Sequence, residues 1–255
     1  MTTINTQDAK RMEKMILKDK ERLDDLHRNN HKIIQHPDLF TFGIDAVLLS
    51  AFATVHKSET HMDLCSGNGV IPILLAAKNK GISYAGAEIN PKLADMATRS
   101  VSLNGLADKI TIHNVDIREM TGFGDNFDVV TANPPYMAAD TGAQNENYDM
   151  AIARHEILCN LDDVVSSAAK LLRFGGRFYM VHRPGRLADI IATLRKHGLE
   201  SKLLRLVHPK ADAPPNTLLI AAAKGGKPHL NIQPPLVVYD ESGQYTDEIR
   251  RIYYE

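Results

Sequence analysis

Short apolar segments alternate with longer amphipathic ones from residue 60 to residue 197, and this alternation constrains the fold more than any other feature of the sequence. Short apolar runs predict strands, and apolar positions that recur every three or four residues predict helices. Strands alternating with helices at this spacing are typical of a doubly wound, mostly parallel sheet, so the predicted fold class is α/β. We expect strands at residues 60–65, 84–89, 110–115, 127–132, 177–182, 203–207 and 218–222, and helices at residues 70–80, 91–103, 151–172 and 186–197.

The segments outside this alternation predict how the chain is divided. Residues 8–27 carry apolar positions among many charges, which predicts an amphipathic helix. Residues 32–42 look extended, and residues 43–53 predict a short buried helix. From Gly225 onward, glycine and proline interrupt the sequence, as expected of a tail. We therefore expect an N-terminal helical extension at 1–31, a central domain at 32–226 and a C-terminal tail at 227–255 packed on that domain.

Composition excludes several classes of protein. The chain has 255 residues, 44% of them hydrophobic and 24% charged, so it can bury a sizeable core. Two cysteines cannot build a disulfide framework, and they form no Cys-x-x-Cys pair for zinc. No apolar run reaches the roughly 18 residues that span a membrane, and the N-terminal segment lacks the features of a signal peptide. We expect a reduced, soluble, cytoplasmic protein without a metal.

The distribution of charge is more informative than its sum. The net charge of −1 argues against a nucleic-acid partner, yet residues 170–210 hold ten Lys and Arg residues and only two acidic ones. Such a stretch could attract phosphate groups locally. It could equally be the solvated surface of ordinary helices and loops, and the charges alone do not decide between the two interpretations.

The loop after the first predicted strand has the composition of a ligand-binding turn. It runs from Asp63 through Gly67 to Gly69 and enters a predicted helix. Glycine allows a tight turn and the close approach of a ligand to the backbone. A dinucleotide fingerprint would place a third glycine where this chain has Pro72, so that motif is broken. Asp63 suits a cationic ligand better than a pyrophosphate.

Two further acids lie at the ends of the next two predicted strands. Glu88 ends the second strand, 21 residues after Gly67, where a carboxylate can accept hydrogen bonds from both ribose hydroxyls. Asp116 follows the third strand, where its carboxylate and the backbone amide of Ile117 could read the edge of an adenine. Each acid alone could also be an ordinary strand-end or helix-cap residue.

Asn133-Pro134-Pro135-Tyr136 follows the fourth predicted strand. A residue that precedes proline is excluded from the helical region, so this tetrapeptide predicts a stiff, extended loop. Such a loop can hold a side-chain oxygen and a backbone carbonyl at fixed positions, where they orient a planar amino group for methyl transfer. Tyr136 could stack on a planar substrate. The alternative is a strand that ends at proline beside a packing tyrosine.

These motifs carry a resemblance to known enzymes. The set Asp63, Gly67, Gly69, Glu88 and Asp116 resembles the S-adenosylmethionine site of class I methyltransferases. Asn-Pro-Pro-Tyr after that set is similar to the signature of amino-group methyltransferases, which act on adenine N6, cytosine N4, guanine N2 or a glutamine amide. Residues 32–49 resemble the segment before the first motif in the bacterial tRNA(Val) adenine-N6 methyltransferase family, and residues 151–156 and 225–254 resemble the Gram-positive branch of that family.

The resemblance implies a fold, a cofactor and a substrate. It implies a Rossmann-like sheet of seven strands with the last one antiparallel, which residues 199–222 can supply, and a methyltransferase domain at 32–226. It implies S-adenosylmethionine as cofactor and the adenine next to the anticodon of tRNA(Val) as target, with the basic stretch 170–210 as a tRNA footprint. Its implied catalytic residues are Asn133, Pro134 and Tyr136, and its implied cofactor-binding residues are Asp45, Asp63, Gly67, Gly69, Glu88, Asp116, Ile117 and Asn133.

Several alternatives stay open at this point. Release-factor glutamine methyltransferases share the tetrapeptide, but they usually carry a separate N-terminal helical bundle, and only 59 residues precede the first predicted sheet strand here. Another RNA or DNA amino-group methyltransferase, or a non-catalytic RNA-binding module, is the remaining choice. Asp45 could also cap a helix that starts near Gly43. Arg154, His155 and the oligomeric state receive no assignment.

Overall fold

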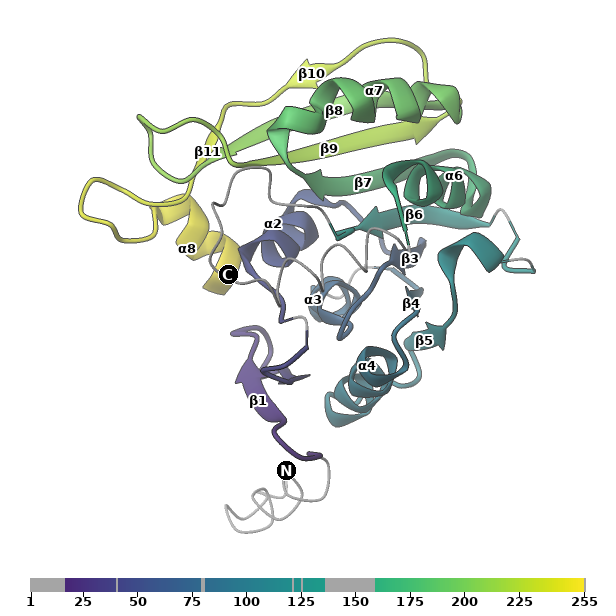
Figure 1. Ribbon diagram of the computed structural model, residues 1–255, viewed down its shortest axis with the longest axis vertical. Helices are drawn as coiled ribbons and strands as arrows, with labels where there is room; N and C mark the ends of the chain where they lie inside the picture. Colours follow the sequence, from purple (N-terminus) through teal and green to yellow (C-terminus); the bar gives the residue numbers. More distant parts are fainter. Residues whose placement is uncertain are drawn as a thin grey trace.

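A computed structural model of the chain describes residues 17–39, 41–78, 81–120, 122–124, 126–135 and 159–254. Its centre is one sheet with the strand order β10-β8-β9-β7-β6-β3-β4-β5, and β11 pairs with β8 beside that path (Figure 1). The strands that form the body of the sheet are β3 (Thr60–Leu64), β4 (Ser83–Glu88), β5 (Ile110–Asn114), β6 (Phe127–Ala132), β7 (Leu172–His182), β8 (Leu199–His208) and β9 (Thr217–Lys224).

The prediction of a mostly parallel α/β sheet is confirmed. Strands β3 to β7 pair in parallel, whereas β9 runs antiparallel to both β7 and β8, as expected for the last of seven strands. Two strands of two residues each, β10 (Asn231–Ile232) and β11 (Leu236–Val237), add to the edge at β8. The sequence did not predict them because a segment of two residues has no measurable periodicity.

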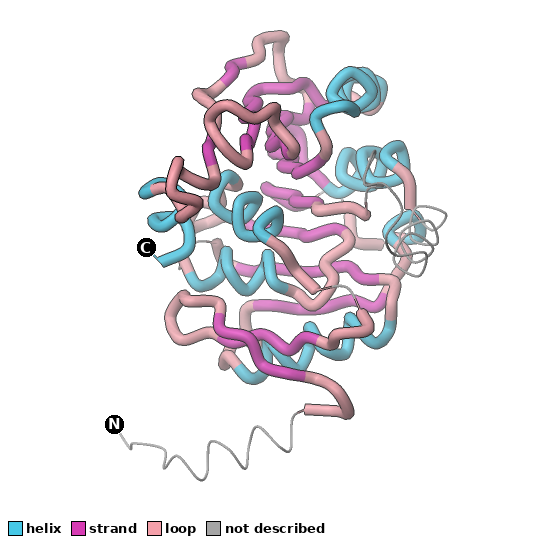
Figure 2. Tube along the Cα trace, turned by 60° about the vertical axis from the view of Figure 1, so that its left-hand side comes forward, coloured by secondary structure: helices cyan, strands magenta, loops and turns pink. Residues whose placement is uncertain are grey.

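Helices lie on both sides of the stacked strands (Figure 2). On one face, α2 (Ile44–Phe52), α3 (Val70–Ala77) and α8 (Asp247–Tyr254) share one apolar cluster with the sheet. On the other face, α6 (Leu161–Leu171) and α7 (Leu187–Lys196) share a second cluster. Neighbouring residues of β7 alternate between the two, since Tyr179 belongs to the first cluster and Phe178 to the second. The sheet is therefore covered on both faces, as a doubly wound fold requires.

Local sequence explains where the helices begin. In α4 (Pro91–Leu103), Asn90 caps the first turn by accepting hydrogen bonds from the backbone N–H groups of Lys92 and Leu93, and Pro91 occupies the first helical position. In α6, Asn160 and Asp163 form a reciprocal capping box. The helix expected at residues 151–172 thus begins at Leu161, and residues 151–158 lie outside the described part of the chain.

The amphipathic helix predicted at residues 8–27 is wrong where the structure describes it, from residue 17 onward. This segment contains β1 (Arg22–Asp25), which pairs antiparallel with β2 (Lys32–Gln35). His27 has a positive φ in the turn, and the backbone N–H of Leu26 donates to the His31 carbonyl across it at 2.9 Å. The three-residue spacing of Leu23 and Leu26, which suggests a helix, instead places two apolar contacts along a hairpin.

The hairpin is fastened to the rest of the domain through β2. The buried backbone N–H of Ile34 donates to Ser100 Oγ on α4 at 3.0 Å, and its carbonyl accepts from Asn68 Nδ2 at 3.2 Å. The backbone N–H of Lys32 donates to Asn104 Oδ1 at 2.8 Å. Because Asn68 lies between the two glycines of the loop after β3, the hairpin contacts the same loop that the sequence assigns to a ligand.

The C-terminal segment is more regular than the predicted tail. It forms β10, β11 and α8, and α8 packs against α2 through Ile249, which is fully buried (Figure 1). Tyr245 stacks on Tyr239 and on Tyr253, with ring centroids 5.3 Å and 5.5 Å apart. The division of the chain at residues 31 and 226 stays a prediction. In the part that the structure describes, no helix is long and apolar enough to cross a membrane.

The contact between the hairpin and α4 can be tested with Ser100→Ala. This change leaves the buried N–H of Ile34 without its acceptor, so we expect the free energy of unfolding to fall by about 1–3 kcal/mol. Urea denaturation measures the difference. The control is Ser102→Ala, whose exposed hydroxyl donates to the Thr98 carbonyl within the same helix and whose loss should cost less than about 0.5 kcal/mol. Equal losses in the two variants would contradict the docking role of Ser100.

Candidate functional site

Strand register brings the predicted site residues to one edge of the sheet. Leu64, the last residue of β3, pairs with Ala87 on one side and with Ala132 on the other. Glu88 pairs with Asn114 at the end of β5. The residues that follow these strands therefore meet at the carboxyl edge, where ligands bind in doubly wound sheets.

The loop after β3 is shaped by its own backbone. Cys65, Gly67 and Gly69 have φ angles of +57°, +56° and +83°, so the chain turns sharply before α3 begins at Val70. A Cβ at Gly69 would lie 3.1 Å from the Cβ of Ala97 on α4. The absence of a side chain at Gly69 thus allows α4 to pack closely against the loop.

Glu88 links the loop to the start of the next helix. Its side chain is buried, Oε2 accepts from the backbone N–H of Gly67 at 2.8 Å, and Oε1 accepts from the backbone N–H of Asn90 at 2.8 Å. Asn90 in turn caps α4. Glu88 therefore fixes the positions of two backbone segments at this edge, a role that the sequence did not predict. Its predicted contact with a ribose stays a prediction.

Asp63 is buried below the glycine loop. Its Oδ1 accepts from Thr131 Oγ1 on β6 at 2.5 Å, and its Oδ2 has no hydrogen-bond partner among the described residues. Burial raises the pKa of Asp63 to about 7. A buried carboxylate oxygen that lacks a donor is uncommon in folded proteins, because its desolvation is uncompensated. This oxygen fits a ligand that brings a cationic or N–H group.

Asp116 is already engaged within the protein. It caps a short 3₁₀ helix, η1 (Ile117–Glu119), by accepting from the backbone N–H of Arg118 at 2.9 Å. The guanidinium of Arg118 lies 2.5 Å from Asp116 Oδ2, and this pairing holds the pKa of Asp116 below its usual range. The carbonyl of Ile117 accepts from Ser167 Oγ on α6 at 2.9 Å. An adenine at this position would share Asp116 with Arg118.

Asp45 lies in the first turn of α2. Gly43 occupies the cap position, so the alternative that Asp45 caps this helix is wrong. Its Oδ1 accepts from Thr217 Oγ1 at the start of β9, at 3.4 Å. Because β9 is antiparallel, Thr217 lies at the same edge as the ends of the parallel strands. A contact between Asp45 and a cofactor stays a prediction.

The proline loop follows β6 at this edge. Asn133 and Pro135 are half-buried and Pro134 is buried. Tyr136, Arg154 and His155 lie outside the described residues. The stacking role of Tyr136 therefore stays a prediction, and Arg154 and His155 stay without an assignment. Ala132, the last residue of β6, pairs with Met180 on β7, two residues before that strand ends at His182.

His182 lies at the same edge of the sheet, but the sequence analysis did not single it out, because a single histidine at a strand end carries no sequence signal. It ends β7, is buried, and accepts at Nδ1 from the backbone N–H of Arg183 at 2.8 Å. Burial and the nearby Arg186 lower the pKa of His182 to about 4, so its imidazole is neutral near pH 7. The sequence analysis also did not single out Thr131, which donates to Asp63, or His61, which contacts Thr131, because both lie inside strands.

The basic stretch 170–210 does not form one surface. Lys170 and Arg173 flank the amino end of β7, whereas Arg183 and Arg186 follow its carboxyl end. Lys210 follows the carboxyl end of β8. Many of these charges are paired with acids, either inside the stretch or elsewhere in the chain. These pairs are Arg173 with Asp128, Arg177 with Glu59, Arg186 with Asp189, Arg195 with Glu200, Lys196 with Asp162 and Arg205 with Glu248.

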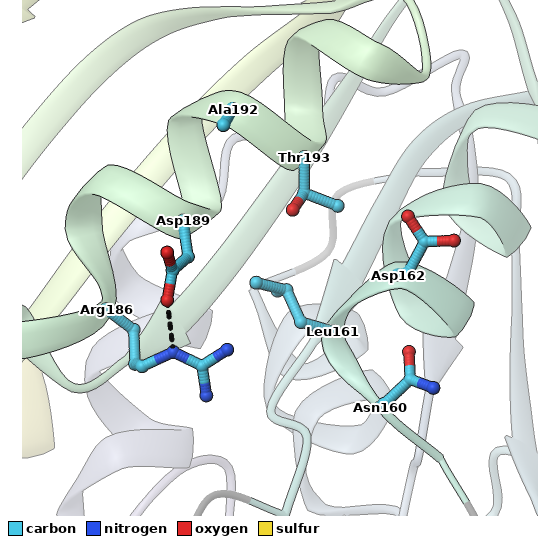
Figure 3. A pocket seen from close by; sticks show the side chains of 7 residues that line it. All are labelled: Asn160, Leu161, Asp162, Arg186, Asp189, Ala192 and Thr193. Carbon is cyan, nitrogen blue, oxygen red and sulfur yellow. Dashed lines mark hydrogen bonds and ion pairs between the residues drawn. The ribbon is translucent and has the colours of Figure 1, made fainter.

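A separate hollow lies between α6 and α7 (Figure 3). Leu161 and Arg186 extend toward it, and Arg186 is paired there with Asp189 at 2.8 Å. None of its lining residues belongs to the predicted cofactor set. Across the described ranges of the chain, no three His, Cys, Asp or Glu side chains are grouped as a metal site requires.

Comparison with known proteins identifies the family of the chain. Residues 31–196 match the family model described as Methyltransferase small domain. The chain is 28% identical over 220 residues to the tRNA1(Val) (adenine(37)-N6)-methyltransferase of Histophilus somni (strain 129Pt), covering 82% of this chain and 87% of that protein.

Two solved structures show the same fold. A predicted O-methyltransferase, protein Atu636 from Agrobacterium tumefaciens, has a TM-score of 0.67 and 22% identity, covering 82% of this chain and 95% of that one. The geranyl diphosphate C-methyltransferase of Streptomyces coelicolor A3(2), solved with S-adenosyl-L-homocysteine, has a TM-score of 0.52 and 13% identity, covering 71% and 77%.

The buried charge of Asp63 can be tested through stability. Its pKa rises from 3.8 to about 7 on folding, so the folded protein binds more protons between these values and loses stability as pH rises through them. Asn cannot ionise. We therefore expect the stabilisation of Asp63→Asn relative to the unmutated chain to be about 2–3 kcal/mol larger at pH 8 than at pH 5.

Urea denaturation at the two pH values measures this difference. Asp212→Asn, which changes an exposed loop carboxyl, is the control and should show no such increase. An Asp63→Asn effect that is the same at both pH values would contradict the buried-charge interpretation.

Proposed function

The chain belongs to the methyltransferase small domain family, and we propose that it methylates the N6 amine of the adenine next to the anticodon of tRNA(Val). The observation that carries this proposal is the position of Asn133, Pro134 and Pro135 at the carboxyl edge, next to the glycine loop, in a chain similar over most of its length to a tRNA adenine-N6 methyltransferase. The methyl donor is S-adenosylmethionine, and such a reaction would take place in the cytoplasm, where tRNA is found.

The described residues fit this cofactor. Asp63 Oδ2 is a buried acceptor without a donor, which suits the positively charged methionine end, and Asp45 would lie at the same end. Gly67 and Gly69 provide the turn that a ligand can approach closely. Glu88 would accept from the ribose hydroxyls, and Asp116 with the backbone amide of Ile117 would hold the adenine.

The reaction needs orientation more than acid–base chemistry. When bound, S-adenosylmethionine supplies an electrophilic methyl group on a positively charged sulfur. The side-chain oxygen of Asn133 and the carbonyl of Pro134 would accept hydrogen bonds from the two N–H groups of the adenine amine and so direct the nitrogen lone pair toward the methyl carbon. Tyr136 would stack on the base after it leaves its neighbours in the tRNA loop.

The alternatives are weaker on this structure. Glutamine methylation of release factors is disfavoured because residues 22–35 form a hairpin rather than part of a helical bundle. A non-catalytic RNA-binding module gives no reason for a buried acceptor at Asp63. Other RNA or DNA amino groups remain the second candidate, since the proline loop serves them equally well. Placement in the Gram-positive branch rests on residues 151–156 and 225–254.

The tRNA footprint is narrower than the whole basic stretch. We propose that it centres on Arg183, Arg186 and Lys210, because these follow the carboxyl ends of β7 and β8 and so lie at the edge that carries Asn133. Lys170 and Arg195 lie toward the opposite ends of the same strands. Phosphate contacts at the edge would hold the anticodon loop over the proline loop.

The division of roles between the two ends of the site predicts opposite outcomes for two variants. Asn133→Ala should lower methyl transfer at least about 100-fold while cofactor binding persists, because its main effect is to remove the acceptor that orients the amine. Glu88→Ala should instead weaken cofactor binding at least about 10-fold, since it releases the glycine loop as well as the ribose contact. Calorimetry gives the affinities, and mass spectrometry of nucleosides from tRNA of a strain lacking the gene gives N6-methyladenosine.

Two results would contradict this assignment. Cofactor binding lost in Asn133→Ala would refute the role of that residue as an acceptor-side group. Cofactor binding by the unmutated chain without any rise in N6-methyladenosine would move the substrate to another RNA, to DNA or to protein.

The footprint predicts a specific loss of salt dependence. The double variant Arg186→Ala/Lys210→Ala should bind tRNA more weakly, and the slope of log affinity against log salt concentration should shrink by about 1 to 2, since each lost phosphate contact removes about 0.7–0.9. Lys170→Ala/Arg195→Ala removes the same charge from other exposed positions and is the matched control. An equal loss in both double variants would show that net charge, rather than this edge, attracts tRNA.

A further inference from the structure

We propose that His61 and Thr131 are positioning residues that hold Asp63 in one orientation and thereby couple cofactor binding to the release of one proton from Asp63. The inference rests on the proposed function, because it takes Asp63 as part of the cofactor site. It goes beyond that function by assigning two residues inside the sheet, and a pH-linked affinity, to the binding step.

The side chains of His61, Thr131 and Asp63 form one buried, hydrogen-bonded row across two strands. His61 and Asp63 are two residues apart on β3 and so face the same side of the sheet, and Thr131 is the register partner of Asp63 on β6. His61 Nε2 lies 2.8 Å from Thr131 Oγ1, which lies 2.5 Å from Asp63 Oδ1. All three residues have no solvent-exposed surface. The row ends at Asp63 Oδ2, directly before the glycine loop.

The direction of these hydrogen bonds follows from their donors. Thr131 has one hydroxyl proton, and a carboxylate can only accept, so Thr131 donates to Asp63 and accepts from His61 Nε2. His61 therefore carries its proton on Nε2, and its Nδ1 has no partner in the described part of the chain. Burial lowers the pKa of His61 to about 3, so this ring stays neutral and does not supply a positive charge to Asp63.

Burial and the charged groups around Asp63 disfavour its ionisation, whereas the neighbouring hydroxyls of Thr131 and Ser66 favour it. Glu88 at the end of β4 acts on it as a second negative charge. Among the described residues, no cationic side chain comes from the loop after β3, from β4 or from α2. Cys65 in the following loop is a thiol, and Tyr84 on β4 packs its ring against His61. The titratable residue of α2 is an acid, Asp45. Helix α3 contributes no titratable side chain. Burial raises the pKa of Asp63 to about 7, so a substantial fraction of the free protein carries a protonated Asp63 below neutral pH.

Binding then exchanges one proton for one ligand cation. The ammonium group of the ligand replaces the proton near Asp63 Oδ2, the O–H bond breaks, and the proton leaves to solvent, so that charge is balanced. Thr131 keeps Oδ1 occupied and leaves Oδ2 as the atom that changes partner. His61 polarises the Thr131 hydroxyl, which strengthens its donation to the carboxylate.

The test measures binding of S-adenosylhomocysteine, which has the ammonium group and is not consumed. For a site with a pKa of about 7, affinity should rise roughly eightfold between pH 5.5 and pH 6.5, a window in which the ligand amine stays protonated. Calorimetry in buffers of different ionisation heat should show about one proton released at pH 5.5. Asp63→Asn should abolish both the pH dependence and the proton release.

The two positioning residues are tested by moving the pH dependence. Thr131→Val removes the donor to Asp63, so the rise in affinity should shift to higher pH and binding at pH 6.5 should weaken by more than about threefold. Thr131→Ser keeps the hydroxyl and should restore the original profile. His61→Leu should shift the profile in the same direction as Thr131→Val, but less. Thermal unfolding without ligand controls for stability.

The possible failures are distinguishable. If the unmutated chain binds S-adenosylhomocysteine equally well at pH 5.5 and pH 6.5, the proton coupling is wrong while the proposed function stands. If Thr131→Val and Thr131→Ser, both folded, have the same profile as the unmutated chain, the positioning role is wrong. If the unmutated chain binds no S-adenosylhomocysteine at any pH, the proposed function fails and this inference fails with it.

Discussion

The two hydrogen bonds that Glu88 accepts are the constraint on which the carboxyl edge depends. One fixes the N–H of Gly67 in the loop after β3, and the other fixes the N–H of Asn90, which caps α4. Through these bonds one buried carboxylate sets the spacing between the ends of β3 and β4 and the start of two helices. A ligand at this edge therefore meets a backbone that is already held in place, which reduces the entropy lost on binding.

Much of this arrangement could be predicted because it depends on local pattern. The seven strands follow from apolar runs separated by helical periods, and ligand-binding positions in such sheets follow the strand ends. The hairpin at β1 and β2 could not be predicted in this way, since Leu23 and Leu26 have a helical spacing and only the pairing with Ile34 and its neighbours settles the conformation. Helix α8 could not be predicted for a related reason, because its stability comes from the burial of Ile249 against distant parts of the chain.

The candidate site likewise contains residues that local sequence could predict and contacts that only the fold creates. Asp63, Glu88 and Asp116 could be singled out from their places at the ends of predicted strands, but their partners within the protein could not. Arg118 lies two residues from Asp116, yet nothing in the sequence says that its guanidinium turns back onto that carboxylate. Thr131 is 68 residues from Asp63 and becomes its neighbour only through the parallel register of β3 and β6. Charge along the sequence misleads similarly, since the strands carry parts of the basic stretch to opposite ends of the sheet.

The polar row of His61, Thr131 and Asp63 lowers the stability of the free protein and suits the proposed binding of a cation. His61, Thr131 and Asp63 occupy positions where apolar residues would give a stronger core, and Asp63 Oδ2 is left without a donor among the described residues. The free-energy cost of burying Asp63 is lowest when its carboxyl is protonated, and a bound cation would offset the cost of the charged form. Deviations from a well-satisfied core are expected at functional positions. The same atom that weakens the free protein at high pH would thus give the proposed site a preference for a positively charged ligand.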